Sequence, residues 1–270
     1  MASYVDIIKE SQKNFFNEPM AETESVMKAF EETDPNHDRR YRLAISTPTR
    51  FFEPPIEGEV TIEWERTNTP GKMTFTTIKV DGVNGSFHEG DKVYFATSEQ
   101  RGDNYSLMFV GYVFKKSRDK RHHIEVVCYD QLRYLKNKYS WVFTNKKASE
   151  ILKSICDDYG LYVGASVTDT TYKVPTIAKE NSEAFDVIIT ALEETLANTG
   201  QMYVLRDDNG IITLRNVLNM KLNRLIDASA AQNFEYTSDI DSETYNSIVL
   251  YYKPTQTATT TTADATTTNP

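Results

Sequence analysis

The sequence predicts an α+β protein that is mainly β, with a strand-rich first part and a smaller second part that contains helices. Three observations support this class. Apolar and polar residues alternate in short runs between residues 41 and 143, as they do in half-buried strands. After residue 144 the apolar spacing becomes that of amphipathic helices, and residues 254–270 are almost entirely Thr, Ala, Asp, Asn and Pro.

The bulk composition limits the classes of function. A length of 270 residues suggests about two domains, and 39% hydrophobic residues suffice for packed cores. A net charge of −9 disfavours nucleic acid and anionic membranes as partners, since both are polyanions. No stretch reaches the ~20 apolar residues of a membrane span, and the start lacks the features of a signal peptide. We expect a protein made in the cytosol, with no membrane contact and no sequence-specific nucleic-acid recognition.

Residues 1–40 are predicted to form an acidic helical arm. Apolar residues recur at partial helical spacing through "AETESVMKAFEE", and the pattern ends at Pro35. Because the apolar stripe is narrow, we expect the arm to dock on another surface rather than to fold alone. The candidate docking residues are Tyr4, Ile7, Phe15 and Phe16.

Residues 41–143 are predicted to form an antiparallel barrel or sandwich. Six runs without an intervening helix have the alternation or composition of strands, and turn signals such as "NTPGK" and "EQRGDN" separate them. The runs are "RYRLAIST", "GEVTIEWER", "KMTFTTIKV", "GDKVYFAT", "YSLMFVGYVF" and "HHIEVVCYD". A short helical turn and a last strand in "YDQLRYLKNKYSWVF" are expected to close this domain. A carbohydrate-binding module would need exposed aromatic side chains, but Trp64 and Trp141 are explained equally well as core residues.

Residues 144–220 are predicted to form a small helix–helix–hairpin domain. The first helix lies in "TNKKASEILKSICDDYGL" and stops at Gly160. A linker with "YKVP" leads to a second helix, which Asn181 or Ser182 caps and Gly200 ends. In the following hairpin, Asn209 and Gly210 suit the positive φ angles of a type I′ turn. New strands are expected in residues 221–253, before the Thr-rich, low-complexity tail of residues 254–270.

Residue patterns that carry chemistry are weak in this sequence. His122 and His123 are neighbours on a strand and point to opposite faces, so they are poorly placed to chelate one metal ion. "RDDNGIITLRN" lacks the spacing of calcium ligands and is better explained as a hairpin turn. Cys128 and Cys156 lie among apolar residues and are expected to be buried thiols. We therefore predict no catalytic residues, no metal and no cofactor.

A basic segment interrupts the acidic chain between Lys115 and Lys147. Opposite charges on one chain suit contact between copies or with charged partners, although a solvated hairpin tip explains the same pattern. The candidate contact residues in this segment are Lys115, Lys116, Arg118, Lys120 and Arg121.

Several blocks, taken in order, resemble a known family. They include "FHEGDKVYFAT", "YDQLRYLKNKYSWVF", "NKKASEILKSICDDYGL" and "TGQMYVLRDDNG", within a resemblance that runs from about Glu59 to Tyr252. The blocks are similar to the XkdQ/YqbQ-type baseplate hub proteins of contractile phage tails and phage-tail-like particles. That resemblance implies a tail-tube-like barrel in residues 41–143, with residues 221–253 as the start of a second barrel.

The resemblance also implies a structural role without catalysis. Hubs of this type form a homotrimer in the baseplate, which joins the tail tube protein to the central spike protein and anchors the wedge proteins. Further implied partners are the tape measure and a LysM-type tail protein, and assembly would take place in the bacterial host cytoplasm. The arm of residues 1–40 is then hypothesised to contact a neighbouring subunit or a wedge protein. The alternative is a tail-tip protein that binds the cell wall or degrades peptidoglycan.

Overall fold

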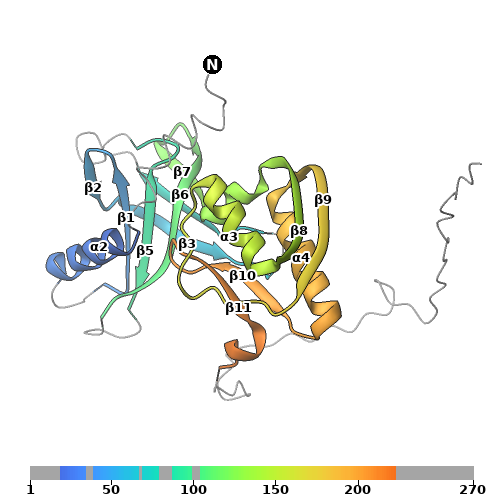
Figure 1. The fold of residues 1–270 in the computed structure, drawn as a ribbon. Helices are drawn as coiled ribbons and strands as arrows, with labels where there is room; N and C mark the ends of the chain where they lie inside the picture. The colour runs from blue at the N-terminus through green and yellow to red at the C-terminus, as the bar shows by residue number, and fades with distance from the viewer. Residues whose placement is uncertain (1–18, 35–38, 67–68, 79–86, 99–103, 223–270) are drawn as a thin grey trace, which may run out of the picture. The chain divides into compact units, whose positions relative to one another are not determined.

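The computed structural model describes residues 19–34, 39–66, 69–78, 87–98 and 104–222, all of which belong to one compact unit (Figure 1). Residues 223–270 form a separate unit outside the described residues. The strands expected after residue 222 and the Thr-rich tail therefore lie outside this description, as do Tyr4, Ile7, Phe15 and Phe16.

A seven-stranded antiparallel sheet forms the first part of the unit, with the strand order β2-β1-β5-β6-β7-β4-β3. Its strands are β1 (Tyr41–Thr47), β2 (Arg50–Phe52), β3 (Ile56–Glu63), β4 (Lys72–Ile78), β5 (Lys92–Thr97), β6 (Ser106–Arg118) and β7 (His123–Tyr129). The predicted class, α+β and mainly β, is confirmed. The sheet is a curled half-barrel whose order ends on β2 and β3. Both edges are unsuited to long pairing, because β2 has three residues and a register shift interrupts β3 between Glu57 and Thr61.

The alternation within the strands places one apolar set on the inner face of the curled sheet. Period-two spacing sends successive side chains to opposite faces, which is why one strand such as β5 supplies two cores. The inner core consists of Leu43, Ile45, Met73, Phe75, Phe87, Val93, Phe95, Phe109, Val113, Val126 and Cys128. The predicted burial of Cys128 is confirmed, since its side chain is fully enclosed.

Helix α2 (Pro19–Thr33) covers the other face of the sheet beside β1 and β5 (Figure 1). Val26 and Phe30 of the helix pack with Ala44, Tyr94 and Ala96 of the strands. The expectation that this narrow apolar stripe docks on another surface is met for α2, and the surface is the chain's own sheet. For this part of the arm no neighbouring subunit is needed.

Arg42 fixes α2 to the sheet through a buried guanidinium group, whose side chain is only 1% exposed. Nη1 donates at 2.8 Å to the Phe30 carbonyl oxygen near the end of the helix, which also accepts the Asp34 amide at 3.2 Å. Nη2 donates to Thr33 Oγ1 at 2.6 Å, and Nε donates to Glu53 Oε2 at 2.9 Å. The guanidinium also lies 4.9 Å from the ring centre of Phe30. One cation therefore links the helix, β1 and the segment after β2.

The second part contains two α-helices, two 3₁₀ helices and two strand pairs: η1 (Gln131–Lys136), β8 (Lys138–Lys147), α3 (Ala148–Tyr159), β9 (Lys173–Glu183), α4 (Ala184–Thr199), β10 (Tyr203–Asp207), β11 (Ile212–Asn216) and η2 (Val217–Met220). The prediction that β8 closes the first domain is wrong, because β8 pairs with β9 in a sheet of its own. The predicted linker around "YKVP" is β9. The helix cap was also misplaced: Glu183, not Asn181 or Ser182, precedes α4.

The helix ends and the hairpin turn follow the sequence signals. Gly160 and Gly200 end α3 and α4 in the left-handed conformation, as their lack of a Cβ atom allows. Asn209 and Gly210 have φ angles of 58° and 88°, and the Asp208 amide donates to the Ile211 carbonyl at 2.8 Å. The predicted tight turn with positive φ at both positions is confirmed. Cys156, at 0% exposure, packs with both helices in the core of this part.

We expect Arg42→Met to lower the free energy of unfolding by about 3 kcal/mol, because it leaves Glu53 and the end of α2 without their buried partner. Urea denaturation measures the loss, and hydrogen exchange locates it in α2. Lys28→Met is the matched control, since Lys28 forms an exposed pair with Glu32 on the same helix. Equal stabilities of the two variants would contradict the assigned role of Arg42.

Candidate functional site

The predicted basic contact residues lie at the β6–β7 hairpin, where the structure separates them into two groups. Lys115, Arg118, Lys120 and Arg121 are exposed. The turn between the strands is held by Asp119, whose Oδ1 accepts from the amides of Arg121 at 2.8 Å and His123 at 2.9 Å. We call Arg118, Lys120 and Arg121 the basic tip. Their side chains form no ion pair with any described residue.

Lys116 differs from the basic tip because its ammonium group holds two segments together. Its Nζ donates to the Phe87 carbonyl oxygen and lies 4.8 Å from the centre of the Phe87 ring. A weaker ion pair with Glu89 spans 3.8 Å. Lys116 therefore anchors the segment before β5 to β6, and a contact role for it stays a prediction.

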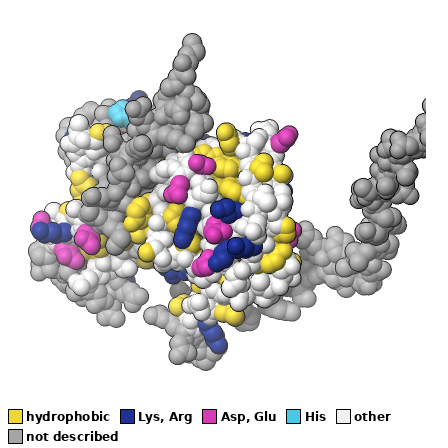
Figure 2. Space-filling model, viewed as in Figure 1, with side chains coloured by type: hydrophobic (Ala, Val, Ile, Leu, Met, Phe, Trp, Pro, Cys, Tyr) yellow, Lys and Arg dark blue, Asp and Glu magenta, His cyan; other side chains and the backbone are white. Residues whose placement is uncertain are grey.

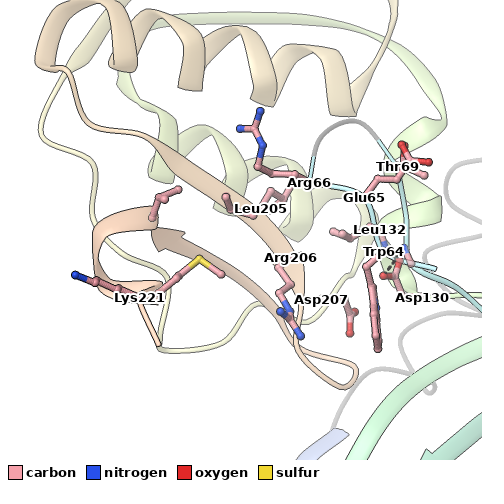
Figure 3. Close-up of a pocket in the computed structure, with 14 residues that line it drawn as sticks. Trp64, Glu65, Arg66, Thr69, Asp130, Leu132, Leu205, Arg206, Asp207 and Lys221 are labelled. Atoms are coloured by element: carbon pink, nitrogen blue, oxygen red, sulfur yellow. Dashed lines mark hydrogen bonds between the residues drawn. The ribbon is translucent and has the colours of Figure 1, made fainter. Parts of the chain in front are cut away.

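A pocket of about 540 Å³ lies where the end of β3, the start of η1, β10 and η2 meet. Apolar side chains of Trp64, Leu132, Val204, Leu205, Val217 and Met220 form much of its wall. Figure 3 shows Trp64, Asp130 and Asp207 close together, with Lys221 at the far end. The sequence left both tryptophans open between a core and an exposed position: Trp141 is 6% exposed and belongs to the core, whereas Trp64 is 46% exposed.

Asp130 is a buried carboxylate that ties three elements together. Its Oδ2 accepts from the Gly71 amide at 2.7 Å, and its Oδ1 accepts from the Leu132 amide at 3.0 Å. The first bond holds the segment before β4, and the second caps η1. A Cβ atom at residue 71 would lie 2.6 Å from Asp130 Oδ2 and 2.9 Å from Trp64 Cδ1. Only glycine therefore fits this approach of backbone to carboxylate and indole.

Asp207, at the end of β10, is the second buried carboxylate of the pocket. Its Oδ1 accepts from the Gly210 amide at 2.6 Å, whereas its Oδ2 is enclosed without a hydrogen bond. The side-chain nitrogen of the neighbouring Gln131 is also buried without a hydrogen bond. No described Lys, Arg or His forms an ion pair with Asp130 or Asp207. The pocket floor thus holds two buried acids and unsatisfied polar atoms.

The surroundings shift the proton affinity of both acids in the same direction. Burial raises the pKa of Asp130 well above its ordinary value of 3.8, and the nearby Asp207 charge raises it further. Burial also raises the pKa of Asp207 to about 6, although the Gly210 amide opposes the shift. Since two adjacent buried charges repel, the pair releases its protons in two separate steps.

The pocket rim carries cations and exposed apolar side chains. The Arg206 guanidinium lies 6.0 Å from the centre of the Trp64 ring, and its Nε lies 2.8 Å from Asp208 Oδ1. Arg66 Nη1 contacts Met202 Sδ at 3.5 Å. Other exposed apolar side chains near the end of the described chain are Leu218 and Leu222. The site combines an apolar wall, an aromatic ring and an acidic floor, which suits a ligand with apolar and cationic parts.

The rest of the described surface and interior offers no reactive group that the sequence overlooked. Burial raises the pKa of Cys128 and of Cys156, so both thiols are inert. Within the described ranges, no three His, Cys, Asp or Glu side chains are grouped to hold a metal ion. None of the helices in these ranges has the length and apolar character of a bilayer crossing. On the face seen in Figure 2, acidic and basic side chains are interspersed with hydrophobic ones.

The sequence alone gave no reason to join Asp130, Asp207 and Trp64 into one site. Asp130 precedes "QLRYLK" as a cap residue would, and Asp207 precedes the Asn209–Gly210 turn, so each has a local explanation. Their proximity depends on how η1, β10 and the end of β3 pack together. The basic tip, in contrast, was visible as a run of like charges.

Comparison with known proteins gives the same family that the ordered sequence blocks indicated. The family model described as YQBQ-like matches residues 60–269. This chain belongs to the YQBQ-like family. The YQBQ-like chain is 30% identical over 177 residues to the uncharacterized protein YqbQ of Bacillus subtilis (strain 168), and 28% identical over 181 residues to the phage-like element PBSX protein XkdQ of the same organism. Each match covers 64% of this chain and 52% of the relative, so the chain spans about half the length of these curated proteins.

Solved structures of tail proteins resemble this YQBQ-like chain more distantly. The 43 kDa tail protein of prophage MuSo2 from Shewanella oneidensis has 12% identity and a TM-score of 0.48, with 64% of this chain and 52% of that chain covered. The tail protein from Neisseria meningitidis MC58 has 9% identity and a TM-score of 0.45, with 65% and 50% covered.

The pKa shift of Asp207 predicts a pH-dependent stability. Because the folded state holds this proton more tightly than the unfolded state, stability should fall as the pH rises from 3.8 to about 6. The fall should reach about 3 kcal/mol for a full one-proton difference over this range. In urea denaturation at several pH values, Asp207→Asn should flatten this slope, whereas the exposed Asp186→Asn should keep it. An unchanged slope in Asp207→Asn would refute the shift.

The two neighbouring lysines of β6 should differ in their effect on stability. Lys116→Met removes the charged donor of the Phe87 carbonyl and should lower the free energy of unfolding by about 1–2 kcal/mol. Lys115→Met, at an exposed position, should change it by less than about 0.5 kcal/mol. Thermal and urea unfolding of both variants checks the difference, and a larger effect at Lys115 would reverse the assignment.

Proposed function

We propose that this chain is a structural subunit of the baseplate hub in a contractile phage tail or a phage-tail-like injection particle. In this proposal three copies form a ring that joins the tail tube to the central spike and anchors the baseplate wedges. The subunit acts through contacts with other proteins and catalyses no reaction. The particle assembles in the cytoplasm of the bacterial host.

The observation that carries the proposal is the YQBQ-like match, which extends over residues 60–269. One relative within this match bears the name of a phage-like element protein. The chemistry of the described residues supports a structural role, because the cysteines are inert and the acids of the pocket are engaged by backbone amides.

The exposed surface of the described residues also supports a role in contacts with other proteins. The β8–β9 ribbon displays Tyr139 and Val142, which are 57% and 73% exposed. Exposed apolar side chains are surfaces that proteins commonly bury against partners.

The experiment that tests the proposal measures the mass of the purified full chain over a range of concentrations, by light scattering and native mass spectrometry. We expect a species of three chains. Electron microscopy of particles from cells that express a tagged chain should place the tag at the baseplate. A monomer at every concentration, together with absence of the tag from particles, would overturn the proposal.

Cell-wall binding is a second candidate, because exposed aromatic rings commonly stack on sugars and Trp64 is exposed beside a pocket. Sedimentation of the chain with purified peptidoglycan separates the two functions. Binding that Trp64→Ala removes would favour this candidate, whereas no binding would favour the structural role alone.

A further inference from the structure

The pocket floor places two acids together without a counter-ion. Asp130 and Asp207 are 3% and 6% exposed, and no described cation pairs with either of them. Burial of carboxylates without a partner is unfavourable, which is why such groups are usually paired or coordinate a cation. The Oδ2 of Asp207 is enclosed beside Gln131 and makes no hydrogen bond, so a donor reaches this acceptor only when the side chains at the pocket floor move apart.

The apolar wall of the pocket fits the aliphatic part of a basic side chain. Leu132, Val204 and Val217 can cover an aliphatic stem, as apolar surfaces commonly do for Lys and Arg. The Trp64 ring lies beside the acids (Figure 3), and the Arg206 guanidinium already lies 6.0 Å from its centre, so an inserted cation would compete with Arg206 for the ring. A Lys or Arg head group would then meet the carboxylates, where charge-assisted hydrogen bonds are strong.

The rim adds a second requirement to this ligand. Arg66 and Lys221 line the pocket farther from the acids, so a segment with basic residues alone would be repelled there. A segment that presents a basic residue next to an acidic one matches both the floor and the rim. The β6–β7 turn has this pattern, since "RDKR" carries Asp119 between the cations of the basic tip; the Asp119 carboxylate also holds its own turn through the amides of Arg121 and His123.

The basic tip and the pocket lie at different ends of the chain's own sheet, so the tip of one copy can meet the pocket of another. The tip precedes β7, whereas Asp130 follows β7, so the donor and the pocket lie at opposite ends of one seven-residue strand. At the rise of an extended strand, these ends are ~20 Å apart. A surface at one end that complements a different surface at the other end forms head-to-tail contacts, which close into rings when the rotation permits.

We propose that the pocket at Asp130 and Asp207 receives a basic side chain from the basic tip of a second copy of this chain. Arg118, Lys120 and Arg121 are the donors, and Trp64 lies against the inserted cation. Each copy then gives its tip to one neighbour and its pocket to the other. The inference rests on the multi-copy assembly of the proposed function and specifies one contact within it.

The first test compares the self-association of the full chain with that of two variants. The tip variant is R118E/K120E/R121E, and the pocket variant is Asp207→Asn, which keeps an acceptor for the Gly210 amide. Each variant alone should associate at least about tenfold more weakly than the wild type. An equimolar mixture should form a species of two chains and none larger, because only one intact tip and one intact pocket are complementary.

The control variant K28E/R40E/K153E changes three exposed cations outside both the proposed contact and the β8–β9 ribbon, and should retain wild-type association. If the wild type assembles and the tip and pocket variants assemble equally well, the contact is wrong while the proposed hub function stands. Equal loss in the control variant would mean that net charge, rather than this contact, drives association, and would also overturn the inference.

A second test does not depend on assembly and uses the peptide KKSRDKRHH, which is residues 115–123 of the chain. Titration into the full chain should change the fluorescence of exposed Trp64 and shift amide signals around Asp130 and Asp207. Asp207→Asn, or Gln in place of Arg118, Lys120 and Arg121 in the peptide, should weaken binding by at least about tenfold. Absence of binding at millimolar peptide, or equal binding of both peptides, would overturn the proposal even if the chain is monomeric.

Discussion

The buried carboxylate of Asp130 is the interaction on which the junction between the two parts of the molecule depends. It follows the last residue of β7, accepts the amide of Gly71 before β4 and caps η1 through the amide of Leu132. The half-barrel and the helical part therefore share this side chain, and Tyr112 of β6 also joins them by packing in the core of the helical part. Because both oxygens accept backbone amides, this acid is fixed in place before any partner arrives.

At the other polar anchors too, a single charged group links segments whose relative orientation is not fixed by hydrophobic packing. Arg42 orients α2 through the carbonyl oxygen of Phe30, and Lys116 holds the segment before β5 through the carbonyl oxygen of Phe87. Apolar packing is non-directional, so it brings these segments together without fixing their orientation. The directional hydrogen bonds supply the missing constraint.

A structural role is consistent with this distribution of charge. The two cysteine thiols are buried and inert, and three of the exposed cations gather at a hairpin tip. An acidic pocket lies at the other end of the same strand. A chain with complementary surfaces at the two ends of a rigid sheet is suited to repeat contacts with its own copies, since the sheet fixes the distance between them.

The sequence by itself determined the class, most strand positions, the ends of α3 and α4, the Asn209–Gly210 turn and the family. Each of these follows from local periodicity, from glycine's freedom at positive φ or from an ordered set of blocks, so no long-range contact is needed to infer it. It could not show that β8 leaves the first sheet for β9, because strand pairing depends on distant partners.

Only the tertiary structure decided that Trp64 is exposed and that Asp130 and Asp207 share one pocket floor. These residues are far apart in the chain, and each has a sufficient local role as a cap, a turn residue or an apolar side chain. Burial raises the pKa of both carboxyl groups, and the Asp207 charge raises that of Asp130 further. These surroundings exist only when β3, η1 and β10 pack together.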